Sequence, residues 1–141
     1  MLPSLVPGLT HTLRYTVPRN KTVPFIYPEN PDFQAMPEVF ATGFMVALME
    51  WSCTDLLKPH LEPGEGSLGT MIEVTHEAAT PAGFTITVQA RLEKIDGRRL
   101  EFEVEGHDGH DMIGKGRHGR AVVTWDRFNQ RVKDKAAKGA K

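Results

Sequence analysis

The stretch from Thr42 to Pro59 reads TGFMVALMEWSCTDLLKP and decides the fold. It predicts one helix, because the hydroxyl of Thr42 can cap the helix by accepting a hydrogen bond from a first-turn N–H. Pro59 ends the pattern, since the residue before a proline is pushed out of the α region. Apolar side chains point in every direction around the axis, which is typical of a helix that protein surrounds on all sides.

Glu50 lies in the middle of this apolar helix. A carboxylate in such surroundings must be paired, protonated or chemically active. Cys53 lies nearby, where packing in the core is a simpler explanation than a role as nucleophile. Glu50 is therefore the first candidate catalytic residue.

Length and composition are those of an ordinary globular domain. The chain has 141 residues, of which 40% are hydrophobic and 25% charged, so we treat residues 1–141 as a single domain. A net charge of −1 gives no sign of nucleic-acid binding, and the basic residues within 129–141 indicate a solvated tail. One cysteine, no signal-peptide pattern and no membrane-spanning stretch predict a cytoplasmic protein.

Alternation with a period of two dominates the chain after the helix. It is clearest over residues 84–94, where Phe84, Ile86 and Val88 alternate with polar residues. We predict strands over residues 9–17, 68–79, 84–94, 99–106 and 112–125. Turn-forming residues separate the last four strands, so they should form an antiparallel meander with one apolar face.

One apolar helix and a curved antiparallel sheet make an α+β fold. The most economical arrangement wraps the sheet around the helix, which is the hotdog architecture. A single subunit of this kind leaves an edge strand and half a site open, so we expect a homodimer.

The segment 18–38 contains five prolines together with several apolar side chains. Proline prevents regular structure here. A long irregular loop rich in apolar groups is uncommon unless it covers something, such as an active site. The segment is therefore either a lid or a loop that packs on the core.

His76 is the second candidate catalytic residue. It shares the more apolar face of the first strand after the helix with Ile72 and Val74, which should turn it toward the helix. A lone histidine on such a face is usually a satisfied core residue, and a buried Glu–His ion pair is the structural alternative. Two ionisable groups inside one small core nevertheless favour catalysis.

Thr42 is the third candidate, beside its capping role. It stands eight residues before Glu50, or ~12 Å along the axis at ~1.5 Å per residue. One helix cannot bring both side chains to one carbon atom, so a partner subunit or a bend before the helix must supply one of them. The free N–H groups of Gly43 and Phe44 suit a thioester carbonyl as it becomes an oxyanion.

Three stretches together resemble the hotdog-fold fluoroacetyl-CoA thioesterase family. They are FATGFMVALMEW (40–51), LEPGEGSLGTMIEVTHEAATPAG (61–83) and GRAVVTWDRFNQRV (119–132). The resemblance implies a catalytic set of Thr42, Glu50 and His76, with Gly69 near the acyl group. It also implies hydrolysis of a short acyl-CoA thioester, with CoA as part of the substrate and no cofactor or metal. Glu50 would activate water or attack the carbonyl, and His76 would move a proton.

The resemblance extends to the lid and to the CoA end. It implies an acyl pocket lined by four lid residues: Val23, Ile26, Phe33 and Met36. Met36 departs from the family pattern, because the fluoroacetyl-specific member carries an aromatic gate at this position and methionine is more flexible. We expect Arg120, together with Arg117 and His118, near the anionic end of CoA.

Other functions remain open at the level of sequence. A broader short-chain acyl-CoA thioesterase without fluorine selectivity would use the same residues. A non-catalytic acyl-CoA-binding protein would not need Glu50 and His76 together. A hotdog hydratase would carry a histidine early in the helix segment, and none occurs between His11 and His60. The histidines and aspartates of residues 107–118 match no strong zinc pattern.

Overall fold

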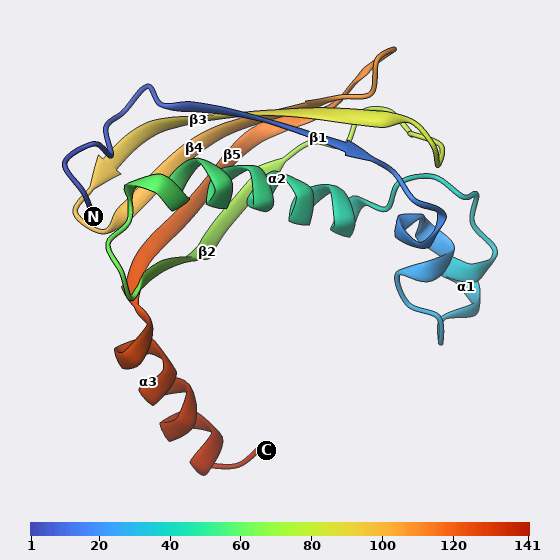
Figure 1. Cartoon of the computed structure of the whole chain (residues 1–141). Helices are drawn as coiled ribbons and strands as arrows, with labels where there is room; N and C mark the ends of the chain where they lie inside the picture. The colour runs from blue at the N-terminus through green and yellow to red at the C-terminus, as the bar shows by residue number, and fades with distance from the viewer.

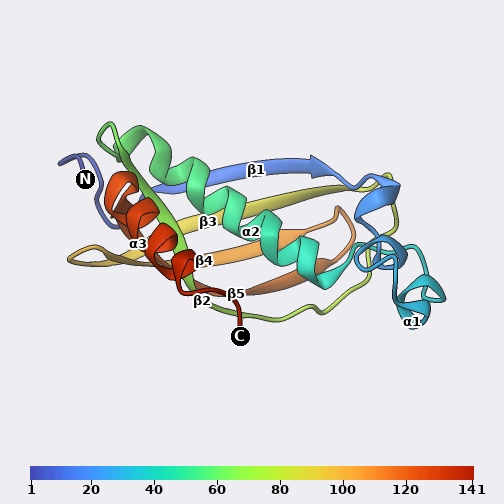
Figure 2. The same cartoon turned by 90° about the horizontal axis from the view of Figure 1, so that it is seen from below.

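A single long helix lies along the concave side of a curved sheet in the computed structural model, which describes all 141 residues (Figures 1 and 2). The helix is α2 (Thr42–Leu57), extended by the short turn η3 (Lys58–His60). The sheet contains β1 (Thr10–Thr16), β2 (Glu65–Val74), β3 (Thr85–Asp96), β4 (Arg99–His107) and β5 (Met112–Thr124). Their spatial order is β1-β3-β4-β5-β2, and all neighbours are antiparallel. The predicted helix-in-sheet arrangement is confirmed. The predicted meander of the last four strands is wrong for β2, because β2 pairs with β5 and not with β3, so only β3, β4 and β5 form a meander.

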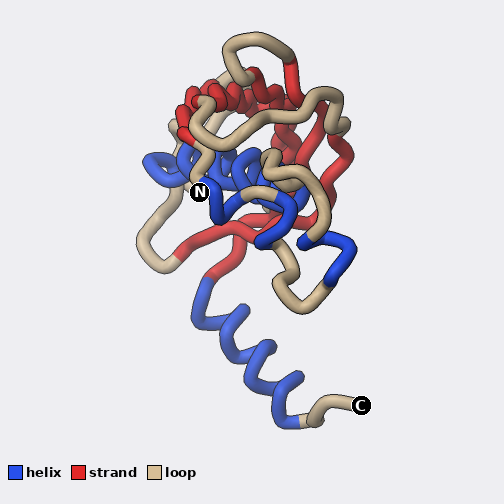
Figure 3. The backbone as a smooth tube through the Cα atoms, turned by 90° about the vertical axis from the view of Figure 1, so that its right-hand side faces the viewer, coloured by secondary structure: helices blue, strands red, loops and turns tan.

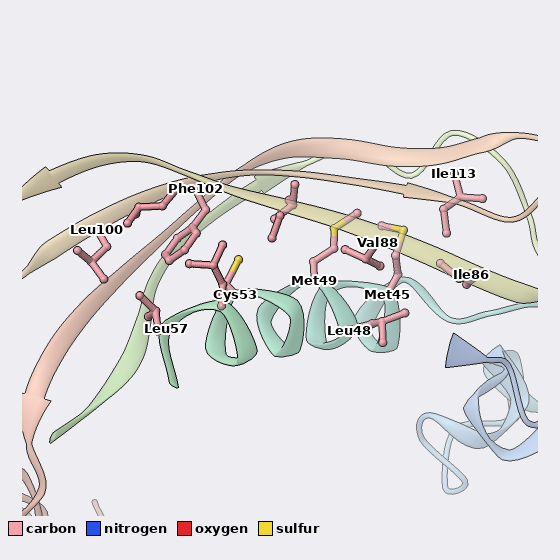
Figure 4. Packing of buried hydrophobic residues seen from close by; sticks show 14 of the residues in the cluster. Met45, Leu48, Met49, Cys53, Leu57, Ile86, Val88, Leu100, Phe102 and Ile113 are labelled. Atoms are coloured by element: carbon pink, nitrogen blue, oxygen red, sulfur yellow. The ribbon is translucent and has the colours of Figure 1, made fainter. Parts of the chain in front are cut away.

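The core forms between one face of α2 and the inner face of the sheet (Figure 4). Met45, Met49 and Leu57 point from the helix toward alternating residues of the strands, such as Val88 and Phe102. The expectation that protein surrounds α2 on all sides is wrong for the single chain, because the sheet covers only one side. Trp51, on the uncovered side, is 47% exposed.

Strand β2 departs from the predicted alternation because it contains a β-bulge. The register shifts between Gly69 and Met71, so Thr70 is the extra residue. Gly69 consequently pairs with Arg120 and faces α2. Strict alternation along the strand predicts that it faces outward. Beyond the bulge the prediction holds, since Ile72 pairs with the inward-facing His118.

The strand also ends at Val74, earlier than the predicted Ala79, so His76 lies in the segment that follows it. This segment still runs beside β5, because the N–H groups of Thr75 and Glu77 donate to the carbonyls of Lys115 and Ile113. Gly114 permits the approach, since a Cβ there would lie 2.2 Å from the Thr75 carbonyl oxygen. The glycine thereby helps to place His76.

The C-terminal residues 125–137 form a helix, α3 (Trp125–Ala137), that points away from the rest of the molecule (Figures 1 and 3). The sequence pattern had indicated strand to residue 125 and a solvated tail from 129. The tail residues are exposed, and those up to Ala137 are helical. Trp125 anchors the helix. Its backbone N–H donates to the Gly64 carbonyl, and its indole ring fills the space where Gly66 lacks a side chain. None of the helices has the length and apolarity that a membrane crossing requires.

The proline-rich segment 18–38 packs beside the N-terminal end of α2 (Figure 2). Proline does not exclude all helical structure there, because the segment contains η1 (Arg19–Lys21), η2 (Val23–Phe25) and α1 (Pro31–Gln34). The Asn30 side chain caps α1 by accepting from the N–H groups of Asp32 and Phe33.

Replacement of Gly114 by alanine tests how the segment that carries His76 is held. We expect the free energy of unfolding to fall by about 1–3 kcal/mol, because the new Cβ meets backbone that cannot rotate away. Thermal and denaturant unfolding measure the effect. The neighbouring Lys115→Ala, whose side chain is exposed, is the control and should leave stability unchanged. Equal stability of Gly114→Ala and the control would contradict this packing.

Candidate active site

Thr42 and His76 form a hydrogen-bonded pair at the N-terminal end of α2. The N-cap position belongs to Ala41, so the prediction that Thr42 caps the helix is wrong. Its hydroxyl Oγ1 instead lies 2.7 Å from His76 Nδ1. A hydroxyl beside an imidazole is an arrangement that can pass a proton in either direction.

His76 keeps a neutral ring in this position. Burial lowers the pKa of His76 below its ordinary value, and the backbone of Ala78 partly opposes the shift. The second ring nitrogen, Nε2, is buried and has no hydrogen-bond partner within the chain. Buried polar atoms are normally paired, so this nitrogen is available to a group from outside the chain.

Glu50 lies two turns further along α2, on the side that faces β2. Its side chain is 39% exposed, so the expectation of a carboxylate enclosed by apolar groups is wrong. The cause is its place beside β2, which is an edge strand of the sheet. Oε2 accepts a hydrogen bond from Arg120 Nη1 at 3.0 Å, whereas Oε1 has no partner within the chain. One oxygen is thus anchored and the other is free to react.

Arg120 is 5% exposed and is directed at Glu50. Its Nε donates to Ser67 Oγ at 2.8 Å and its Nη2 to the Ser67 carbonyl at 2.9 Å. These contacts leave the guanidinium little freedom to reach a CoA phosphate, contrary to the expectation for this residue. Arg117 is exposed and bridges Glu73 and Glu101.

Gly69 makes room for the carboxylate. A Cβ at this position would lie 2.7 Å from Glu50 Oε2, which is closer than carbon and oxygen approach without bonding. The resemblance had placed this glycine beside the acyl group, and the structure places it directly against the Glu50 carboxylate. The bulge at Thr70 is what turns Gly69 to this side.

The single chain therefore contains two separate groups of candidate residues. Thr42 and His76 form one, and Glu50, Arg120 and Gly69 form the other. Thr42 is already the first residue of a regular helix, so no bend before α2 brings the two groups together. Eight helical residues keep them ~12 Å apart along the axis.

The four lid residues lie toward the N-terminal end of α2. Ile26 reaches the first turn of the helix, since its Cδ1 is 2.9 Å from the place that a Cβ on Gly43 would take. Val23 is half-buried, and the ring of Phe33 stacks on that of Tyr27 with 5.9 Å between centroids. Met36 is 46% exposed.

Cys53 is excluded as a nucleophile at neutral pH. It is fully buried, and burial raises the pKa of its thiol to about 12. The thiolate that would react is therefore almost absent.

Sequence reasoning also did not place His118 here. It lies beneath Arg120, with its Nε2 3.1 Å from Arg120 Nη1. Its position two residues before Arg120, on the same face of a strand, was the available signal.

Comparison with known proteins identifies the family of the chain. The family model of FlK, fluoroacetyl-CoA-specific thioesterase, matches residues 24–126. A fluoroacetyl-CoA thioesterase of Streptantibioticus cattleyicolor is 55% identical over 132 residues, which cover 94% of this chain and 95% of that protein. A solved structure of the fluoroacetyl-CoA thioesterase FlK superposes with a TM-score of 0.91 at 55% identity, covering 94% of this chain and 98% of that one.

More distant structures share the same fold. A thioesterase superfamily member from Thermus thermophilus superposes with a TM-score of 0.83 at 27% identity, over 97% of this chain and 99% of that one. A hot-dog-like protein from Thermanaerovibrio acidaminovorans reaches 0.79 at 21% identity, over 95% and 93% of the two chains, which supports the hotdog fold alone. The chain is a hotdog acyl-CoA thioester hydrolase, and it belongs to the FlK family of fluoroacetyl-CoA-specific thioesterases.

Proposed function

We propose that this protein hydrolyses fluoroacetyl-CoA to fluoroacetate and CoA. The observation that carries the proposal is the Glu50 carboxylate, anchored through one oxygen by Arg120 and free at the other. The activity named for the 55% identical relative supports the choice of substrate. The reaction needs no cofactor, because CoA is part of the substrate. The single cysteine supports a reducing compartment such as the cytoplasm.

A second copy of the chain would complete the site. Edge strand β2 has no neighbour on one side, and Ile72, although it faces inward, is 41% exposed. An antiparallel pairing of two β2 strands would place two α2 helices side by side in opposite directions. Glu50 of one copy would then approach the N-terminal end of the other helix. The unpaired Nε2 of His76 supports this arrangement.

The chemistry follows from these positions. Oε1 of Glu50 takes a proton from water while the water oxygen adds to the thioester carbonyl carbon. The N–H groups of Gly43 and Phe44, at the positive end of α2, stabilise the resulting oxyanion. The C–S bond then breaks, and the proton passes to the CoA sulfur through His76. Direct attack by Glu50, followed by hydrolysis of the mixed anhydride, needs the same residues.

A broader short-acyl-CoA thioesterase is the second candidate function. The observation that favours it is Met36, which is exposed and flexible where the family pattern has an aromatic gate. Both candidates use the same catalytic residues. They differ only in the ratio of rates on fluoroacetyl-CoA and acetyl-CoA.

Glu50→Gln tests whether the protein is an enzyme of this kind. We expect kcat/KM on fluoroacetyl-CoA to fall by at least about 100-fold, because the amide can neither take a proton nor attack. Release of free CoA thiol measures the rate, with acetyl-CoA and longer acyl-CoAs in parallel. Glu73→Gln, on the outer face, is the matched control and should retain activity. Unchanged hydrolysis in Glu50→Gln would refute the assignment, and an inactive wild type would favour a binding protein.

Gly69→Ala tests the placement of the carboxylate. The added Cβ displaces Oε2 from Arg120, and a shift of ~1 Å at a reacting group costs on the order of 100-fold in rate. We expect kcat to fall while the unfolding temperature changes little, since only the end of one side chain has to move. Thr70→Ala, at the adjacent bulge residue, is the control for the strand. A kcat equal to that of wild type would show that Glu50 tolerates displacement.

A further inference from the structure

His118 lies beneath the Glu50–Arg120 pair and is 1% exposed. It is on the inner face of β5, and its ring packs 6.4 Å from the ring of Phe102, measured between centroids. It is almost completely closed to solvent. Its surroundings nevertheless determine its hydrogen bonds completely.

Both ring nitrogens of His118 have partners that permit only one role. Nδ1 lies 2.8 Å from the Met71 carbonyl oxygen, which can only accept, so Nδ1 carries the proton. Nε2 lies 3.1 Å from Arg120 Nη1, which can only donate, so Nε2 is unprotonated. The two contacts independently require the same neutral tautomer. His118 is therefore an acceptor for Arg120, and its 3.8 Å approach to Glu50 is not an ion pair.

This acceptor fixes the orientation of Arg120. The Nη1 group has two N–H bonds, and one goes to His118 while the other goes to Glu50. Ser67 holds the opposite side of the guanidinium through Nε and Nη2. Because the group is planar, contacts on both sides determine where the N–H that meets Oε2 points. The position of the carboxylate thus depends on a residue that does not touch it through a hydrogen bond.

We propose that His118 is a positioning residue for thioester hydrolysis, acting through Arg120 to hold the Glu50 carboxylate in its reactive place. The inference rests on the proposed function. His118 contacts neither the substrate nor the reacting atoms, and its effect is on the geometry of Glu50. A shift of a reacting group by ~1 Å is enough to cost on the order of 100-fold in rate.

Protonation of His118 would dismantle this arrangement. It would turn Nε2 into a donor that faces another donor, and it would place a second cation beside Arg120. Burial, and after it the charge of Arg120, lower the pKa of His118, while the Met71 carbonyl and Glu50 oppose the shift. The aromatic neighbour of His118, Phe102 on β4, is uncharged. The neutral ring therefore persists at neutral pH.

Two variants separate positioning from packing, because each keeps one of the two hydrogen bonds. His118→Gln can place its carbonyl oxygen near the Nε2 position and still accept from Arg120. His118→Asn can donate to the Met71 carbonyl but leaves the Arg120 N–H unpaired. We expect kcat to fall about 10- to 100-fold in His118→Asn and to stay within about threefold in His118→Gln, with KM little changed in both.

The pH profile provides a further measurement. In the wild type, both His76 and His118 must be neutral, so protonation of either should lower kcat at acid pH. Glutamine does not titrate, so the acid decline in His118→Gln should involve one protonation fewer than in the wild type. For stability, both folded and unfolded His118 are neutral above about pH 6.5. Below about pH 6.5, His118 in the unfolded chain binds a proton, whereas His118 in the folded chain stays neutral to lower pH. The free energy of unfolding of the wild type therefore falls as the pH falls.

Nitrogen NMR of the imidazole is independent of activity. We expect the Nδ1-protonated neutral tautomer for His118, persisting below pH 6.5. A different tautomer, equal losses of kcat in the two variants, or no loss in either would overturn the inference. A wild type that shows this tautomer but hydrolyses no acyl-CoA would instead refute the proposed function.

Discussion

The ion pair between Arg120 and Glu50 is the interaction on which the candidate site depends. A carboxylate placed between a helix and a sheet loses part of its hydration, and it stays charged at low cost only if a cation and a hydrogen bond replace the water. Arg120 supplies both at 3.0 Å. Arg120 is itself buried, so it needs partners of its own, and Ser67 and His118 provide them.

The backbone is shaped around this pair. The bulge at Thr70 brings Gly69 to the inner face, where any side chain would collide with the carboxylate. The same strand, β2, is one of the two edge strands of the sheet. Glu50 therefore lies at the border of the molecule, half-exposed, and not in its centre. The position leaves the carboxylate accessible to a substrate.

The sequence predicted the architecture because its two periodicities are strong. The apolar stretch 42–59 and the alternation over residues 84–94 each have one structural solution. Thr42, Glu50 and His76 were singled out as candidates because ionisable or hydroxyl groups interrupt these patterns. The bulge at Thr70 was missed, since one extra residue inverts the alternation without any local signal other than the glycine.

Helix α3 was missed although Trp125, Phe128 and Val132 have helical spacing, because the charged residues between them also suit a solvated tail. Arg120 was expected near the anionic end of CoA because arginine pairs well with phosphate, and only the tertiary structure shows that its guanidinium is buried against Glu50.

The most direct test of the two-subunit site mixes two inactive variants, Glu50→Gln and His76→Ala, under conditions that exchange subunits. If Glu50 of one copy works with Thr42 and His76 of the other, half of the dimers are mixed and one of their two sites is intact. Activity should then recover to about a quarter of the wild-type value. If all three residues act within one chain, every site in a mixed dimer carries a lesion. Subunit exchange must first be demonstrated. If activity then does not recover, the result contradicts a site that two chains share.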